Sequence, residues 1–192
     1  MAVFKNMHDE NEIIKGCCKG ERKAQKHLFE EYSKKMYPVC MRYAKNSEDA
    51  DDILQEAFIK IFKNIKTFRK ESSLYYWIKR IVINTALNYQ RSKLYLYPMV
   101  DVQDLHGLAE KESTLSSFQL KDLLKLLQTL PDGCRVIFNL YAIEGYQHKE
   151  IAEMLGISVG TSKSQYARAK SLLKDKIIDS EKIQYEQFRE KF

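Results

Sequence analysis

Residues 148–174 read HKEIAEMLGISVGTSKSQYARAKSLLK, and their pattern predicts two short helices joined by a tight turn. The first helix should begin at the start of this stretch and end near Leu155. Gly156 follows, at the position where a residue that tolerates left-handed backbone is usual. Ser158 is placed to cap the second helix, which should run to the end of the stretch. This is the helix-turn-helix pattern, whose second helix usually lies in the DNA major groove.

The second helix has two distinct faces when it is drawn at about 100° per residue. One face carries Ser162, Tyr166, Ala169 and Leu173, and we expect it to pack on the first helix. The other face is small, polar and basic, which suits contact with base edges and phosphates; the alternative is a solvated surface helix. The residues predicted to contact duplex DNA are Thr161, Ser164, Gln165 and Arg168, with Lys149 and Lys163 as flanking cations.

The composition favours an all-α protein with an anionic partner. The chain has 192 residues, with 32 Lys and Arg against 26 Asp and Glu, and a pI of about 9.0. Glycine and proline are few, at 7 and 3, and apolar residues recur with helical spacing over long stretches. No signal-peptide core or membrane-length apolar run is found, so we expect a cytoplasmic protein without membrane insertion.

The reactive residue types form no recognisable enzyme motif. Cys17 and Cys18 are adjacent, whereas Cys40 and Cys134 are isolated in apolar sequence, so we expect reduced thiols in or near the core. The sequence has no phosphate-binding glycine loop, no HExxH and no GxSxG, and its histidines are scattered. We therefore expect no metal, no cofactor and no catalysis by this chain.

The first half of the chain predicts four helices. They cover about residues 9–17, 21–45, a segment that starts at Ser47, and 74–92, with a kink or break near Tyr37 because Pro38 follows. The apolar positions that recur at helical spacing are Leu28, Tyr32, Met36, Val39 and Tyr43, then Ile53, Ala57, Ile61 and Ile65, and then Ile78, Val82, Thr85 and Tyr89.

The helix predicted for residues 74–92 combines aromatic, cationic and amide side chains. Residues 69–93 hold six Lys or Arg against one Glu. Rings can stack on unpaired bases, cations can bind phosphate, and Asn can bond a base edge; alternatively the rings are core and the cations solvated. The candidate residues for unpaired DNA are Phe68, Arg69, Lys70, Tyr75, Tyr76, Trp77, Arg80, Asn84, Asn88 and Arg91.

The second half begins with a break in the helical pattern. Residues 94–117 contain Pro98 and Gly107 and read as a flexible linker, which is longer than connections inside compact domains usually are. A second domain should then hold four helices, including one over about 133–144 that Gly145 ends. The charged tail from Asp179 is expected to fray.

With both domains laid out, the chain resembles the bacterial RNA polymerase sigma factors of the extracytoplasmic-function (ECF) class. Residues 47–65, SEDADDILQEAFIKIFKNI, are similar to the segment that binds the polymerase β′ clamp helices. Residues 68–93, FRKESSLYYWIKRIVINTALNYQRSK, resemble the promoter-melting segment, and residues 127–173 resemble the −35-binding domain. The resemblance implies sigma region 2 at 9–93, the linker at 94–117 and sigma region 4 at 118–178.

The resemblance also implies partners and roles. Trp77, Arg80 and Asn84 match the family's W-x-x-R-x-x-x-N, next to a loop that captures a flipped −10 base. The partners would be core RNA polymerase, through the β′ clamp helices and β flap, and promoter DNA. Members of the class are commonly held by an anti-sigma factor, so such a partner is left open, and the free protein would be a monomer. The polymerase-binding residues implied are Asp51, Asp52, Gln55 and Glu56.

Two departures and two alternatives accompany the resemblance. The family often has Val where Ser162 stands and Arg where Gln165 stands. The loss of a cation at Gln165 shifts the expected readout toward amide hydrogen bonding with adenine. A dimeric helix-turn-helix regulator that works without polymerase is one alternative. An adaptor or anti-sigma protein is the other. Taken without the resemblance, the acidic start at Ser47 fits a well-capped solvated helix as well as a docking surface.

Overall fold

The computed structural model describes the backbone of residues 10–94 and 120–189, and these residues are helical with no strand. The all-α prediction is therefore confirmed for this part of the chain. The molecule divides into two compact units, Met1–Tyr89 and Gln90–Phe192. The predicted linker at 94–117 lies, apart from the end of one helix, outside the described residues. No described helix is both long and apolar enough to span a bilayer.

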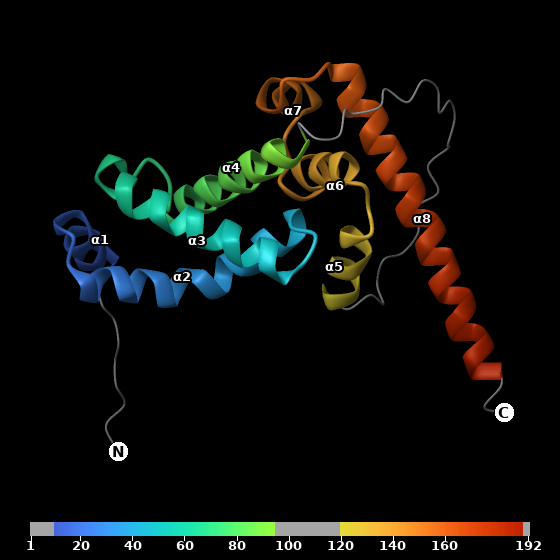
Figure 1. The fold of residues 1–192 in the computed structure, drawn as a ribbon, viewed down its shortest axis with the longest axis horizontal. Helices are drawn as coiled ribbons and strands as arrows, with labels where there is room; N and C mark the ends of the chain where they lie inside the picture. The colour runs from blue at the N-terminus through green and yellow to red at the C-terminus, as the bar shows by residue number, and fades with distance from the viewer. Residues whose placement is uncertain (1–9, 95–119, 190–192) are drawn as a thin grey trace. The chain divides into compact units, whose positions relative to one another are not determined.

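The N-terminal unit is a layered set of helices in which α1 and α3 pack on α2 (Figure 1). Residues of α1 also contact the short helix η1, which continues α3. The elements are α1 (Glu10–Lys19), α2 (Arg22–Tyr43), α3 (Ser47–Asn64), η1 (Ile65–Thr67) and α4 (Leu74–Leu94).

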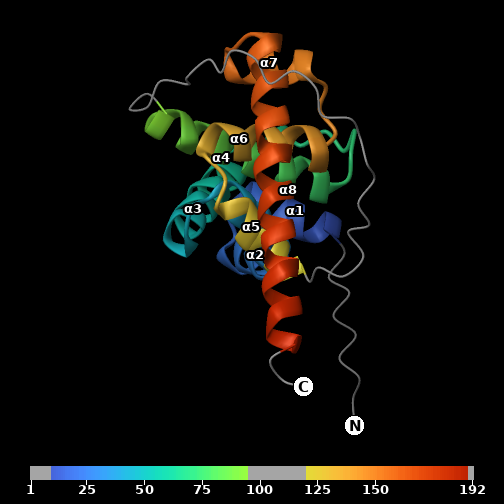
Figure 2. The same ribbon diagram turned by 90° about the vertical axis from the view of Figure 1, so that its right-hand side faces the viewer.

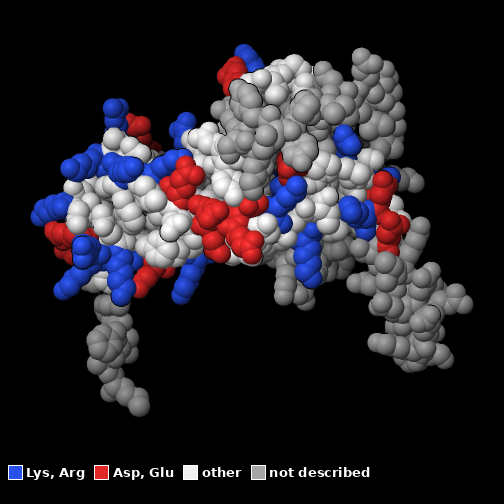
Figure 3. Space-filling view, in the orientation of Figure 1, with Lys and Arg blue, Asp and Glu red and all other residues white. Residues whose placement is uncertain are grey.

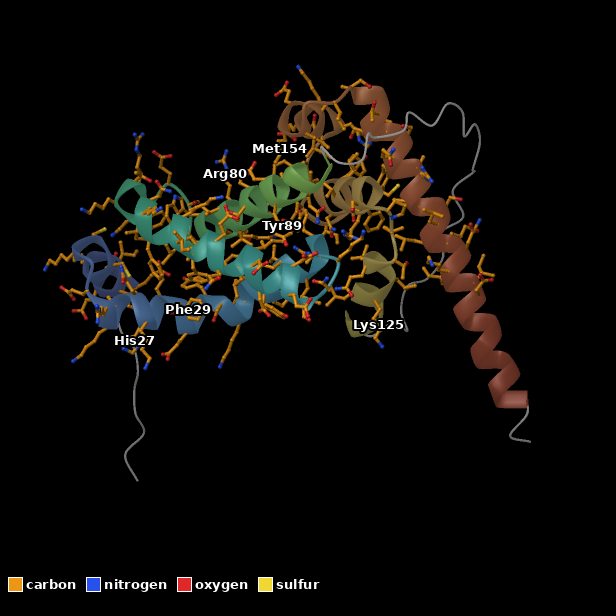
Figure 4. The ribbon with its side chains drawn as sticks, viewed as in Figure 1. His27, Phe29, Arg80, Tyr89, Lys125 and Met154 are labelled. Atoms are coloured by element: carbon orange, nitrogen blue, oxygen red, sulfur yellow. The ribbon has the colours of Figure 1, made fainter. Side chains whose placement is uncertain are left out.

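The predicted apolar stripes form the core of this unit. Every stripe residue predicted for α2 and for α3–η1 is buried, and so are the first three of those predicted for α4. The fourth, Tyr89, is half-buried, and its hydroxyl donates a hydrogen bond to Asp49 Oδ1 at 2.7 Å. This bond links α4, on which Figure 4 labels Tyr89, to the first turn of α3.

A kink or a break was predicted near Tyr37, and the break is wrong, because α2 continues through Pro38. Proline removes one backbone donor and pushes against the carbonyl four residues earlier. Here Pro38 and Lys34, the residue four positions before it, are both exposed. Water can therefore hydrogen-bond the freed carbonyl. The exposed position of the proline explains why one continuous helix forms.

The C-terminal unit is built along one long helix, with α5, α6 and α7 packed against α8 (Figure 2). The helix expected over 133–144 is α6 followed by a π-helical turn, η2, and Gly145 ends it with a φ of 81°. The elements are α5 (Leu120–Gln128), α6 (Asp132–Phe138), η2 (Asn139–Ile143), α7 (His148–Leu155) and α8 (Val159–Arg189).

The predicted end of the last helix is wrong. It was expected near Lys174 with a fraying tail, but α8 continues to Arg189. Residues 175–189 contain no Gly or Pro that would stop a helix. Their charged residues include Lys, Glu and Arg, which are good helix formers, so a charged tail does not by itself predict fraying.

A fully buried arginine joins α5 to α6. The Arg135 side chain has 0% exposure, and its Nη2 lies 2.6 Å from Asp132 Oδ1. Its Nη1 donates to the backbone carbonyls of Leu130 at 3.2 Å and Gln128 at 3.5 Å. One cation thus satisfies carbonyls at the end of α5 and a carboxylate in the first turn of α6. The turn between the two helices is fixed by this network.

We predict that Asp132→Ala destabilises the C-terminal unit by about 2 kcal/mol or more, because it leaves a buried cation without its carboxylate. Hydrogen exchange of the amides in α5 and α6 of the full chain measures this change. Arg135→Met, which removes the charge and keeps an unbranched side chain, should cost less than Asp132→Ala. A loss below about 0.5 kcal/mol for Asp132→Ala, within the range of ordinary surface changes, would contradict the structural role of the pair.

Candidate nucleic-acid interface

One face of α4 presents a row of polar side chains. Arg80, Asn84 and Asn88 are exposed, and they recur four residues apart, so they share a face. Arg80 points away from α2 and α3 (Figure 4). The buried stripe of α4 forces this row outward, since the two sets occupy different sides of the same helix. Arg91 belongs to the same predicted row, but its side chain lies outside the described residues.

The aromatic residues near the start of α4 differ in how much of each ring is exposed. Trp77 is half-buried, and its ring packs on Phe68 with centroids 5.4 Å apart. Tyr75 is also half-buried and meets Tyr76 edge-on at 5.3 Å. The Tyr76 side chain is 64% exposed, so among these rings it offers the most surface for stacking. The predicted aromatic cluster therefore exists, but Trp77 also has a packing role.

The loop before α4 is held in a defined shape by α1. Lys70 has a φ of 60°, which is unusual for a residue with a side chain, and its ammonium group donates to the side-chain oxygen of Asn11. Arg69 is exposed beside it. Asn11 could not be predicted as a partner, because the two residues are far apart in the chain and the packing of α1 on η1 brings them together.

The acidic face predicted on α3 is exposed. Asp51, Asp52, Gln55 and Glu56 all lie on the surface, and Glu56 pairs with Lys60 at 2.6 Å. Figure 3 shows acidic side chains gathered over α3, and basic ones over the end of the same unit that holds α1. Asn46 caps the helix by accepting the Asp49 amide at 2.7 Å. On the face drawn in Figure 3, the acidic cluster over α3 is thus distinct from the basic cluster at the α1 end.

The helix-turn-helix forms, and its first helix, its turn and the start of its second helix have the expected bounds. The first helix is α7, Gly156 follows it in left-handed conformation with a φ of 69°, and the Ser158 hydroxyl accepts the amide of Thr161 at 2.9 Å. The predicted turn and cap are confirmed. Of the predicted DNA-facing residues, Lys149 and Lys163 are exposed, while Thr161, Ser164 and Arg168 are half-buried.

Gln165 is the exception, and its prediction as a groove-facing residue is wrong. Its side chain is only 6% exposed, and its Oε1 accepts a hydrogen bond from the Cys134 thiol at 3.0 Å. The buried stripe of α8 is Ser162, Gln165, Ala169 and Leu173, and Tyr166 is half-buried beside it. The amide is therefore used inside the protein and does not face adenine.

His148 lies at the centre of a cluster that the sequence did not reveal. Its Nδ1 is 2.9 Å from Ser162 Oγ, and its ring stacks on Tyr141 with centroids 4.2 Å apart. Tyr166 meets the same ring edge-on at 5.8 Å and stacks on Phe138 at 5.9 Å. Burial, and secondarily the charge of Lys163, lowers the pKa of His148 below its ordinary 6.5. The ring is thus held neutral between α7, η2 and α8.

The thiols lie where the composition suggested. Cys17, Cys40 and Cys134 are buried, Cys18 is half-buried, and all four are free. Burial raises the pKa of Cys17 to about 11 and that of Cys40 to about 12. Both groups are protonated at neutral pH and therefore unreactive.

Comparison with known proteins places both units in one family. The model of sigma-70 region 2 matches residues 28–94, and that of sigma-70 region 4 matches residues 120–173. The ECF RNA polymerase sigma-E factor of Escherichia coli K12 is 30% identical over 177 residues, covering 86% of this chain and 92% of that protein. The chain belongs to the ECF sigma factors. As such it directs RNA polymerase to promoters for transcription initiation.

A second sequence relative agrees with this family. The sigma-E factor of Haemophilus influenzae is 29% identical and covers 86% of this sigma factor and 93% of its own length. Among solved structures, a sigma factor RpoE crystallised with the anti-sigma factor NepR from Bartonella quintana has a TM-score of 0.48 at 21% identity, covering 78% of this chain and 94% of that one.

The lowered pKa of His148 predicts a stability loss in mild acid. The unfolded chain takes up a proton near pH 6.5, whereas the folded ring resists it, so the stability is complete above that pH and falls as the pH drops below it. Hydrogen exchange of α7 and α8 at pH 7.5 and 5.5, corrected for the intrinsic exchange rate, measures the change. His148→Asn should remove most of the pH dependence, whereas His27→Asn, on the exposed face of α2, should not. An unchanged slope in His148→Asn would contradict the assignment.

Proposed function

We propose that residues 9–93 act as sigma region 2 and residues 118–178 as sigma region 4, joined by a linker at 94–117. The first would dock on polymerase and open the −10 element, and the second would bind the −35 element. The protein would act in the cytoplasm as a non-catalytic subunit, because the polymerase supplies the chemistry. The observation that carries this proposal is the separation of an acidic exposed face on α3 from a polar, cationic and aromatic one on α4.

The α4 face supports a role in binding unpaired DNA. Flipping a base out of the duplex costs a few kcal/mol, and stacking on an aromatic ring returns about 1–3 kcal/mol per base. Tyr76 offers an exposed ring, Arg69 and Arg80 offer cations, and Asn84 and Asn88 offer amides on the adjacent helix surface. This combination favours a melted strand over a duplex, whose bases would not reach a ring.

The −35 element would be bound by a smaller set of residues than the sequence suggested. With Gln165 buried, the polar face of α8 consists of Thr161, Ser164 and Arg168, with Lys163 exposed next to them. Lys149 would add a phosphate contact from α7. The Thr161 hydroxyl also lies 2.8 Å from that of Ser158, so part of its hydrogen-bonding capacity serves the helix cap.

Polymerase docking would make these weak DNA contacts effective. Each unit has only a few cations on its proposed DNA surface, so each alone should bind DNA weakly through phosphate contacts that salt screens. Holding both units on one polymerase raises the effective concentration of each at its promoter element. The proposed docking residues on α3 are three exposed acidic side chains and one exposed amide: Asp51, Asp52, Glu56 and Gln55.

We predict that Asn84→Ala in the full-length protein weakens promoter opening by about 1–3 kcal/mol, or roughly 5- to 100-fold, while polymerase binding is kept. The measurement is permanganate reactivity of unpaired thymines in the −10 region. Assembly with core polymerase is measured in parallel by gel filtration. Asn84 is exposed, so its loss should not disturb the core.

The matched control is Asn64→Ala, which changes an exposed Asn at the end of α3, outside the proposed DNA surface. It should open the promoter as the wild type does. Equal opening by Asn84→Ala and the wild type would contradict the proposed role of α4. Loss of polymerase binding in Asn84→Ala would instead place this surface against the polymerase.

A further inference from the structure

The two positions of α8 that depart from the family's usual residues both carry buried hydrogen bonds. Ser162 is 0% exposed and bonds to His148 of α7 at 2.9 Å. Gln165 is 6% exposed and accepts from Cys134 of α6 at 3.0 Å. The N-terminal part of α8 is therefore hydrogen-bonded to two different helices. We call the two contacts the His148–Ser162 pair and the Cys134–Gln165 pair.

The C-terminal part of the same buried face of α8 is held by apolar contacts. Ala169 and Leu173 belong to an apolar cluster with Leu127, Leu130 and Cys134. Apolar burial is non-directional, so it stabilises the position of a helix more than its rotation. Hydrogen bonds weaken steeply when their angle is poor, so they constrain rotation. The directional contacts lie next to the residues proposed to face DNA.

The two pairs oppose rotation in both directions. Ser162 and Gln165 are three residues apart, which places them about 60° apart around the helix axis. Their partners lie on α7 and α6, so turning α8 toward one partner pulls it from the other. Thr161, Ser164 and Arg168 are on the same two turns, and their direction follows any such rotation.

The partners themselves are well fixed. The His148 ring is stacked on Tyr141 at 4.2 Å and met edge-on by Tyr166. Cys134 is 0% exposed within the apolar cluster. A hydrogen bond to a fixed partner constrains a helix more than one to a mobile surface side chain.

We propose that the His148–Ser162 and Cys134–Gln165 pairs are positioning residues that set the rotation of α8 and thereby the −35 sequence preference of this sigma factor. They touch no base themselves. They determine which of the three polar residues on α8 reaches which base edge. This inference rests on the proposed reading of the −35 element by α8.

The test uses two matched pairs of substitutions in the full-length protein. Cys134→Ala removes the donor and Cys134→Ser keeps one of similar size. Ser162→Val removes the hydroxyl, and Ser162→Thr has the shape of valine but keeps a hydroxyl. Each variant is assembled with core polymerase and presented with promoters that carry a randomised −35 element, and transcripts are counted for each sequence.

The expected result is a flattened preference in Cys134→Ala and Ser162→Val. The ratio between the best −35 sequence and its single-base variants should fall about fivefold, the equivalent of one hydrogen bond's net contribution of about 1 kcal/mol. Cys134→Ser and Ser162→Thr should keep the wild-type ratio. Total transcription should change less than the ratio does.

A merely structural role gives a different pattern. All −35 sequences would then lose transcription by the same factor, hydrogen exchange of α8 would accelerate, and the ratio would stay constant. A constant ratio in Cys134→Ala and Ser162→Val overturns the inference while leaving the proposed −35 role intact. A wild-type protein that shows no −35 preference at all would instead refute the proposed role of α8, and the inference with it.

Discussion

The arrangement of the C-terminal unit depends on the burial of one face of α8. Among the α8 side chains that the structure describes, the buried ones are Ser162, Gln165, Ala169 and Leu173. The remaining side chains of α8 are therefore the ones that could contact DNA. Two of these four side chains are polar, and each has a hydrogen-bonding partner inside the unit. Burying a polar group without a partner would cost at least about 1 kcal/mol. The hydrogen bonds to Cys134 and His148 avoid this cost, so Gln165 and Ser162 can be buried.

The N-terminal unit is also organised by the burial of one side of each helix, but the buried side chains are mainly apolar. Its helices bury apolar stripes, and the exposed rows on α3 and α4 are the sides left over. The Tyr89–Asp49 hydrogen bond connects the beginning of the acidic helix to the later part of α4. The surfaces proposed for docking and for melting are thereby linked within one unit.

Most of this architecture could be predicted from local sequence chemistry. Gly156 and Ser158 are residue types with specific roles at helix ends, so the helix-turn-helix was placed correctly. The errors arose where tertiary contacts decide. Gln165 lies at the edge between two helical stripes, and only the position of Cys134 on α6 turns it inward. His148 looked unpaired because Ser162 and Tyr141 meet it only in the folded unit. The length of α8 was missed because no residue marks its end.

The most direct test of the central claim is transcription from a fragment library of the native genome, with core polymerase from the same organism, with and without this protein. The account predicts discrete new start sites, each preceded by two sequence motifs at constant spacing, because two units on one polymerase bind two promoter elements. New start sites with only one shared motif, or none with the polymerase bound, would contradict it.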